Sequence, residues 1–152
     1  MSNNNLIIPT QENILTLPIG KRIYFLSDIH LGASTLKNNT AREQHLIMWL
    51  EKIRPNCGAL FLLGDIFDFW FEYKHAVPKG HIRFLSKICE FTDSGIPVHF
   101  FTGNHDIWVF DYLPQECGIT LHTHNQAFQI HNKHFLLGHG DALNPKDKGY
   151  LF

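Results

Sequence analysis

The sequence predicts an α/β protein, and three observations support this fold class. Apolar runs typical of buried strands alternate with longer segments of helical periodicity. The 152 residues suffice for one domain with a substantial core, and 44% of them are hydrophobic. Four of the apolar runs lead directly into glycines and polar residues, an arrangement typical of sites at the carboxyl ends of sheet strands.

The first half of the chain shows a strand, a helix and a second strand. Residues 21–27 are predicted to form the first strand, and residues 40–53 a helix with an apolar face. Thr40 is a candidate N-cap, because Glu43 three residues later completes a capping box. Residues 59–63 form a continuous apolar run, as expected of a parallel strand buried on both faces.

The second half continues the alternation and then turns to short strands. A helix is predicted over residues 79–92, with Ile82, Leu85, Ile88 and Cys89 on one side and Gly95 as its stop signal. A hairpin is expected between the last two of the remaining strands. These strands are predicted at residues 98–101, 119–122, 127–130 and 133–137. No repeat or interdomain linker interrupts the pattern, so residues 1–152 are expected to form a single domain.

Four short segments that follow apolar runs carry side chains able to bind a metal. They are Asp28-Ile29-His30, Gly64-Asp65, Gly103-Asn104-His105-Asp106 and Gly138-His139-Gly140-Asp141. Because ligands of open α/β sheets bind beyond the carboxyl ends of the strands, we expect these segments to converge. The glycines allow tight turns and close backbone approach. The convergence of carboxylates, an amide and imidazoles predicts a metal site.

These four segments resemble the pattern of the calcineurin-like metallophosphoesterases, which is D-x-H, G-D, G-N-H-D/E and G-H. The resemblance covers nearly the whole chain from Arg22 onward. It implies a sandwich of two sheets flanked by helices, and a metal-dependent phosphoesterase. The family pattern also has a final Gly-His-x-His segment, whose two histidines complete the metal site. The 152 residues contain no such segment.

Ligand chemistry assigns five metal ligands and two divalent ions. Asp65 can bridge both ions, because a carboxylate has two oxygens and the metals of two-metal hydrolases lie about 3.5–4 Å apart. Asp28 and His30 are expected on the first ion, and Asn104 and His139 on the second. The mixed nitrogen and oxygen ligands favour Mn, Fe or Zn over Ca. Mn is the metal we expect, with Fe and Zn as alternatives. The structural alternatives are that Asp28 or Asp65 caps a turn, and that His30 or His139 is a hydrogen-bonded polar residue at a strand end.

Further site residues follow from the resemblance alone. It implies that His105 is catalytic and contacts the substrate together with Asn104, while Asp106 orients the His105 ring. His105 would stabilise the developing phosphoryl charge or protonate the leaving oxygen; a structural role is the alternative. Asp147 matches a position that contacts the sugar-nucleotide in related lipid enzymes, although a charged segment of this kind can equally be a solvated loop.

The extensions of two segments narrow the resemblance to one branch of the family. Gly64-Asp65 continuing to Trp70, and Asp141 continuing to Tyr150, look like the UDP-2,3-diacylglucosamine pyrophosphatases of lipid A biosynthesis. This implies hydrolysis of the pyrophosphate by metal-activated water, which releases UMP and a lipid X-type monophosphate. His105 departs from that branch, where many members have arginine. The alternatives are another calcineurin-like phosphoesterase, acting on nucleotides or phosphoproteins, and an inactive truncated fragment.

The aromatic run after Asp65 has two readings. Phe67, Phe69, Trp70, Phe71 and Tyr73 are expected to pack in the core, with lipid binding as the alternative. The acidic residues within the run, Asp68 and Glu72, are expected at the rim of the site or behind its ligands.

Composition restricts partners and location. A net charge of -1 and a pI near 6.8 give no broad basic surface for nucleic acid, so a phosphorylated small molecule or lipid is the expected partner. The sequence predicts a cytoplasmic protein, because its three scattered cysteines lack C-x-x-C spacing and it has neither an export signal nor an apolar stretch of ~18 residues. For a lipid substrate, peripheral contact with the inner membrane is expected. The chain stops in a stretch that resembles the interior of the family's domain, so we expect it to hold only the N-terminal part of that domain.

Overall fold

The computed structural model describes residues 12–35 and 37–140. Within them the chain forms α-helices and two sheets, in the α/β arrangement that the sequence predicts. The elements are β1 (Glu12–Leu15), β2 (Arg22–Leu26), α1 (Asn39–Ile53), a 3₁₀ turn (Arg54–Asn56), β3 (Cys57–Leu63), α2 (Ile82–Asp93), β4 (Val98–Phe101), α3 (Tyr112–Cys117), β5 (Thr120–His122), β6 (Gln126–Ile130) and β7 (Lys133–Leu137).

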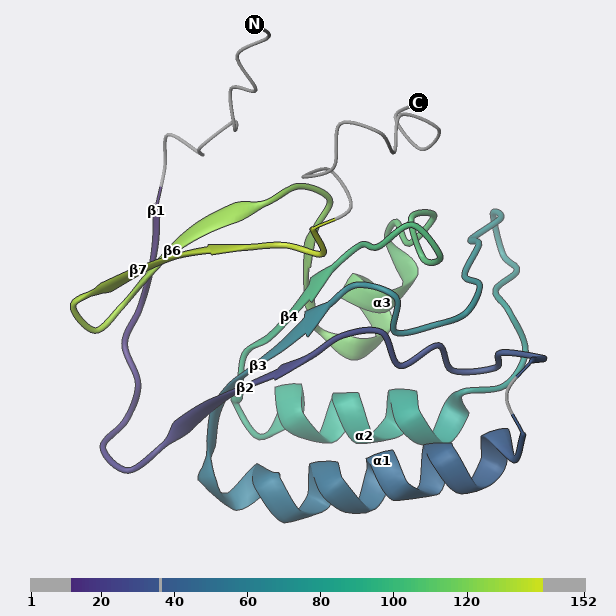
Figure 1. Cartoon of the computed structure of the whole chain (residues 1–152), viewed down its shortest axis with the longest axis horizontal. Coiled ribbons are helices and arrows are strands. Elements are labelled where there is room, and N and C mark those ends of the chain that lie inside the picture. The colour runs from purple at the N-terminus through teal and green to yellow at the C-terminus, as the bar shows by residue number, and fades with distance from the viewer. Residues whose placement is uncertain (1–11, 36, 141–152) are drawn as a thin grey trace, which may run out of the picture.

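The larger sheet is parallel, with strand order β2-β3-β4-β5, and the helices connect its successive strands. Helices α1 and α2 lie side by side against one face of this sheet (Figure 1). Strand β3 lies at its centre, where Leu60 and Leu62 pack in the core on the helix side while Ala59 and Phe61 pack on the other. All four side chains are fully buried, which confirms the prediction of a strand covered on both faces.

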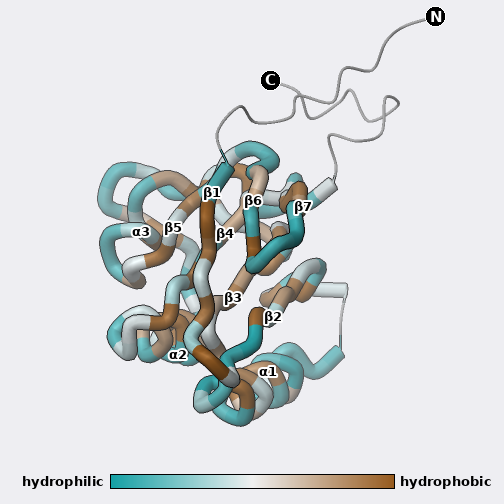
Figure 2. Tube along the Cα trace, turned by 90° about the vertical axis from the view of Figure 1, so that its left-hand side faces the viewer, coloured by the Kyte–Doolittle hydropathy of each residue, from teal (hydrophilic) through white to brown (hydrophobic). Residues whose placement is uncertain are grey.

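The smaller sheet has the order β1-β6-β7, in which β1 runs parallel to β6 and β7 antiparallel to it. It covers the face of the larger sheet opposite the helices, as the side view shows (Figure 2). Phe61 and Phe101 of the larger sheet meet Phe128 and Ile130 of β6 in a second core. The result is the sandwich of two sheets flanked by helices that the family resemblance implies.

Among the strands and α-helices, β1 and α3 were not predicted, because distant residues stabilise them. Strand β1 pairs with β6, more than a hundred positions further along the chain, as in the pair Glu12 and Ala127. The short helix α3 is capped from outside, since the Glu72 carboxylate accepts hydrogen bonds from the N–H groups of Asp111 (2.9 Å) and Tyr112 (3.1 Å). Neither interaction leaves a local sequence signal.

The predicted start of each long helix is wrong by one to three residues. Helix α1 begins at Asn39, and its N-cap is Asn38, whose side chain accepts the N–H of Ala41 at 3.4 Å, rather than Thr40. Glu43 completes no capping box there, because its carboxylate accepts the N–H of Phe84 at the start of α2 (3.4 Å).

Helix α2 begins at Ile82 rather than at residue 79, and Ile82, which the helical pattern groups with the buried Ile88, is 74% exposed. The core-facing residues of α2 include Phe84, Ile88 and Phe91, which are nearly fully buried. The helix ends at Asp93, and Gly95 follows in a left-handed conformation, which confirms Gly95 as the stop signal.

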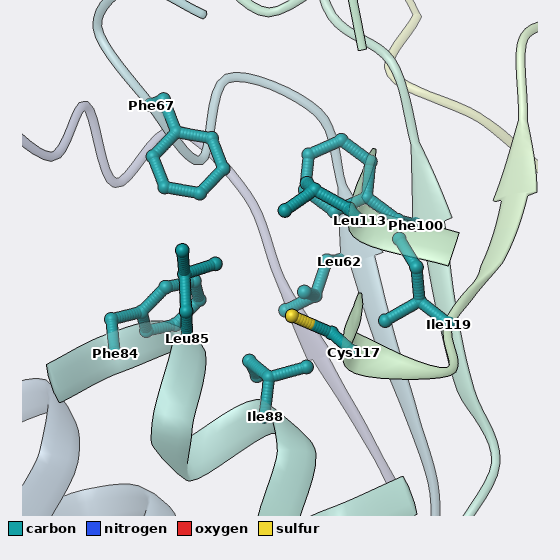
Figure 3. A pocket seen from close by; sticks show the side chains of 9 residues that line it. All are labelled: Leu62, Phe67, Phe84, Leu85, Ile88, Phe100, Leu113, Cys117 and Ile119. Atoms are coloured by element: carbon teal, nitrogen blue, oxygen red, sulfur yellow. The ribbon is translucent and has the colours of Figure 1, made fainter. Parts of the chain in front are cut away.

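A small cavity of about 10 Å³ lies between the larger sheet and helices α2 and α3 (Figure 3). Apolar side chains line it, and the volume is that of about one water-sized probe, so it is a packing void. Burial raises the pKa of the Cys117 thiol, which points into this void, to about 12. In the described part of the chain, no helix has the length and hydrophobicity needed to cross a bilayer.

Candidate metal centre

The loops after β2 and β3 are held together by backbone hydrogen bonds that continue the strand pairing. The N–H of Asp28 donates to the carbonyl of Gly64 (3.2 Å), and the N–H of His30 donates to the carbonyl of Asp65 (2.9 Å). The N–H of Leu31 bonds to the next carbonyl along, that of Ile66 (2.9 Å). These bonds fix the first and second predicted segments beside each other.

Three candidate ligands have an uncommon backbone conformation. Asp28, His30 and Asp65 have φ angles of 54°, 48° and 54°, in the left-handed region that residues other than glycine seldom occupy. Such strain costs of order 1–3 kcal/mol per residue and concentrates at functional sites, where the surrounding structure enforces it. Its presence at all three positions supports a functional role for this edge of the sheet.

Two groups of candidate donors meet at Asp65. One consists of His30, Asp65 and His105, and the other of Asp28, Asp65 and His139. Within each group, one ligand atom from every residue lies within 4.8 Å of the others. The Oδ2 atom of Asp65 lies 3.4 Å from Nε2 of His139 and 3.7 Å from Nε2 of His30. Asp65 is thus common to both groups, as a bridging ligand must be.

This grouping differs from the pairing assigned by sequence, which put Asp28 with His30. The reason lies in the packing around Gly64. The backbone of Asp28 is hydrogen-bonded to Gly64, and the ring of His139 lies only 2.7 Å from the point where a Gly64 Cβ would be. Asp28 and His139 therefore approach Asp65 together, while His30 approaches it with His105.

The donor set fits divalent metal ions. Asp65 is 4% exposed, and its carboxylate lies within 4.8 Å of a ligand atom of Asp28, so two like charges meet in a partly desolvated site. Within the described residues, the ion pairs of Asp65 are to His30 and His139 rather than to lysine or arginine. Imidazole nitrogens mixed with carboxylate oxygens suit Mn, Fe or Zn.

Backbone and carboxylate partners orient the histidine rings. Nδ1 of His139 donates to the carbonyl of Leu63 at 2.9 Å, because a carbonyl oxygen can only accept. Nδ1 of His105 donates to the carbonyl of Asp68 at 2.7 Å in the same way. In a neutral imidazole, the free lone pair is then on Nε2. Hydrogen bonds of this kind fix the tautomer and rotation of histidines that bind metals in other proteins.

Asp68 connects the two histidines of one donor group. Its Oδ1 atom lies 3.6 Å from Nδ1 of His30 and 3.8 Å from Nδ1 of His105. The ring of His30 therefore lies between two carboxylates, with Asp65 beside Nε2 and Asp68 beside Nδ1. The sequence indicated Asp68 only as a rim or supporting group; its position three residues after Asp65 in the same loop was the available signal.

Asp106 holds the second and third segments together. It is fully buried, and burial raises the pKa of its carboxyl group, while hydrogen bonds from the backbone act in the opposite direction. The resemblance implied that Asp106 orients the ring of His105; in the structure, that ring instead bonds to Asp68. The N–H groups that donate to Asp106 are those of Gly103 (2.7 Å), Ile66 (2.8 Å), Asp65 (3.3 Å) and Phe67 (3.3 Å).

Gly103 allows the third segment to approach Asp65. A Cβ atom at this position would collide with Oδ1 of Asp65 and lie 2.6 Å from its backbone nitrogen. The N–H of His105 donates to the same carboxylate oxygen at 3.0 Å. Asn104 lies between these two residues and is half-buried, so its backbone is at the site. Asp147, the predicted substrate contact, lies outside the described residues.

The aromatic run after Asp65 divides between core and surface. Phe67 and Trp70 are fully buried, as the packing interpretation predicts. Phe69 (57%), Phe71 (40%) and Tyr73 (60%) are substantially exposed instead. The run therefore combines two core residues with three exposed aromatic side chains.

Comparisons with known proteins identify the family. The family model for calcineurin-like phosphoesterases matches residues 21–149, and the chain therefore belongs to the calcineurin-like phosphoesterase family. The chain is 46% identical over 120 residues to the UDP-2,3-diacylglucosamine hydrolase of Porphyromonas gingivalis, a match that covers 79% of this chain and 46% of the relative. It is 30% identical over 134 residues to the protein of the same name from Actinobacillus succinogenes, covering 85% of this chain and 53% of the relative.

The chain thus spans about half the length of the curated relatives it matches. Among solved structures, it is similar to the nuclease MPE of Pseudomonas putida, with 18% identity and a TM-score of 0.44. That match covers 64% of this chain and 46% of the nuclease.

Proposed function

We propose that the protein is a metal-dependent hydrolase that cleaves the pyrophosphate of UDP-2,3-diacylglucosamine, giving UMP and an acylated glucosamine 1-phosphate. The observation that carries the proposal is the pair of donor groups that share Asp65 at the rim of the sheet. Family membership supports phosphoester chemistry, and the relatives named UDP-2,3-diacylglucosamine hydrolase support the substrate.

Asp28, His30, Asp65, Asn104 and His139 would hold two divalent ions, with Mn as the working choice. When bound, such ions neutralise phosphate charge and activate water as a nucleophile. The protein contributes a fixed bridging carboxylate, because Asp65 is buried and the backbone around it is anchored by Asp106. Two carboxylates against two divalent ions leave a net positive site, which attracts an anionic phosphate.

His105 would act on the substrate. Its side chain is 40% exposed, more than those of His30 and His139, and its Nδ1 atom is held by the carbonyl of Asp68. In the imidazolium form both ring nitrogens carry a hydrogen, and the Nε2–H of His105 would then stabilise developing charge on the phosphoryl oxygens or protonate the leaving oxygen. Acid catalysis of this kind contributes roughly 10²–10⁴-fold to the rate.

The surface beside the centre supports an acylated substrate over a nucleotide or phosphoprotein. Phe71 and Trp108 are exposed by 40% and 43%, and their ring centroids lie 5.9 Å apart. This aromatic surface can shield apolar chains from water. It could also make peripheral contact with the cytoplasmic face of a membrane, which is the location we propose.

The test is release of UMP from UDP-2,3-diacylglucosamine in the presence of Mn²⁺. We expect turnover that EDTA abolishes and that Asp65→Ala abolishes as well, because loss of a shared ligand disturbs both ions. Asp93→Ala, which changes an exposed carboxylate on α2, is the matched control and should keep the rate. Hydrolysis of nucleotides or phosphopeptides without UMP release would favour another phosphoesterase, and no hydrolysis of any of these would contradict enzymatic activity of this chain.

A further inference from the structure

A groove of about 400 Å³ opens on the surface next to the candidate metal centre. It lies between four stretches of chain: residues 31–32, 39–43, 68–69 and 78–81. Its volume falls within the range of about 300–1,000 Å³ that small-molecule sites occupy. It is separate from the apolar void beneath the sheet, with which it shares no lining residue.

The groove is continuous with the centre through Asp68. This residue lines the groove, and its carboxylate also lies 3.6 Å from Nδ1 of His30 and 3.8 Å from Nδ1 of His105. A molecule with its phosphate at the metal centre would therefore reach the groove as soon as it extends past Asp68.

Packing contacts fix one wall of the groove. The ring of His81 lies at a tilt to the buried ring of Phe67, with centroids 5.0 Å apart, and covers Gly32, where an added Cβ would lie 3.1 Å from the His81 ring. Gly32 also has a φ of +88°. Other residues are therefore disfavoured there both by the close His81 ring and by the left-handed backbone. On the opposite side, Glu43 is tied to the start of α2 by the hydrogen bond from Phe84. The groove is thus formed before any ligand arrives.

Its lining suits a nucleoside better than an acyl chain. The carboxylates of Glu43 and Asp68 and the hydroxyl of Thr40 can accept hydrogen bonds from ribose hydroxyls or a base N–H. The exposed ring of Phe69 offers a stacking surface for a planar base, and Lys79 offers a positive charge for phosphate. The aromatic residues Phe71 and Trp108, by contrast, do not line the groove.

We propose that this groove binds the nucleoside part of the substrate, which leaves as UMP, while the acylated sugar extends from the metal centre toward Phe71 and Trp108. The inference rests on the proposed function for the identity of the substrate. It adds a place for each half of that substrate: a polar groove for uridine and the exposed aromatic surface for the acyl chains.

The test maps ligand contacts on the 152-residue chain by ¹H–¹⁵N NMR with diamagnetic Zn²⁺ present. UMP is the probe, and inorganic phosphate is the reference for the metal centre alone. We expect UMP to shift the amides of residues 31–32, 39–43 and 79–81, and phosphate to leave them unchanged. Phe69→Ala should weaken UMP binding roughly tenfold, as expected for loss of one base–aromatic stack, without weakening phosphate binding. Phe110→Ala is the control, since Phe110 is exposed to a similar degree (54% against 57%) and lies outside the groove.

Identical shifts from UMP and phosphate, UMP shifts at Phe71 and Trp108, or no UMP binding at millimolar concentration would each overturn the inference. The spectra also report whether a variant is folded. Turnover of UDP-2,3-diacylglucosamine without UMP shifts in the groove would reject the groove alone. UMP shifts in the groove without turnover would reject the proposed hydrolysis and leave the groove as a nucleotide site.

Discussion

Hydrogen bonds donated by Nδ1 decide which ring nitrogen His105 and His139 can offer to a ligand. His139 and His105 both donate from Nδ1 to a backbone carbonyl, and His30 has the Asp68 carboxylate on its Nδ1 side. Each of the three rings is thus oriented by a contact on its Nδ1 side. The roles of His105 and Asp68 can be separated by experiment, because one is expected to face the substrate and the other to act only through its neighbours.

His105→Ala is expected to lower turnover by roughly 10²–10⁴-fold while metal content is unchanged. Turnover should fall because the His105 ring is exposed toward the expected substrate. Metal content should not change because Asp65 and its other partners remain. Elemental analysis and steady-state kinetics on the same preparation give both quantities. Because the geometry also admits His105 as a donor beside His30, stoichiometric loss of one metal would show that His105 is a ligand instead.

Asp68→Asn is expected to weaken metal affinity or activity about 10–100-fold, the usual effect of losing an outer partner of a metal-binding histidine. The substitution keeps the shape but removes the charge beside Nδ1 of His30 and His105. Isothermal titration with Mn²⁺ measures the affinity, and Asp68→Glu should restore part of it. Affinity and rate equal to the unchanged protein would reduce Asp68 to a surface residue.

At the scale of elements, the site depends on how closely the loops after β3 and β4 approach each other. Asp106 ties them through four backbone N–H groups, and Gly103 removes the side chain that would keep them apart. The rings of His99 (β4) and His122 (β5) both pack against Phe128 of the smaller sheet. This ring pair therefore reports on the contact between the two layers.

Gly103→Ala is expected to lower both stability and metal affinity, because its Cβ would collide with the backbone and carboxylate of Asp65. Gly95→Ala is the comparison: there no atom lies within 4 Å of the added Cβ, and only the left-handed conformation is penalised, by about 1–2 kcal/mol. Urea unfolding and Mn²⁺ titration distinguish the two variants. Normal metal affinity in Gly103→Ala would mean that the loops do not need this approach.

The His99–His122 pair predicts a loss of stability in acid. The ring nitrogens of His99 and His122 lie 3.0 Å apart. Burial, together with the nearby ring of His122, lowers the pKa of His99 to about 4. Burial also lowers the pKa of His122. The unfolded chain, with an ordinary histidine pKa near 6.5, binds more protons than the folded chain below that pH. The contribution of His99 is thus present above pH 6.5 and is lost as the pH falls toward 4.

His99→Phe should therefore flatten the decline of the urea midpoint between pH 7.5 and 4.5. A phenylalanine ring can keep the stacking on Phe61, whose ring centroid lies 4.6 Å from that of His99, without titrating. His45→Phe, at an exposed position on α1, should keep the original decline. An equal decline in both variants would place the acid sensitivity elsewhere.

At the scale of the whole molecule, the sequence was informative where the signal is local. Continuous apolar runs such as residues 59–63 identified the buried strands, and the polar segments after them indicated which side chains would meet at Asp65. Strand β1 and helix α3 were missed because their partners, β6 and Glu72, are distant in the chain. The partner of the His105 ring was misassigned to Asp106 for a similar reason, since the actual contact comes from Asp68 in another loop.

That metals bind at the centre stays a prediction, and anomalous X-ray scattering from crystals soaked in Mn²⁺ tests it most directly. The predicted result is two manganese peaks about 3.5–4 Å apart, both in contact with Asp65. One peak should lie toward His139 and the other toward His30. A single peak, or peaks that do not contact Asp65, would contradict the account of a two-metal centre bridged by this carboxylate.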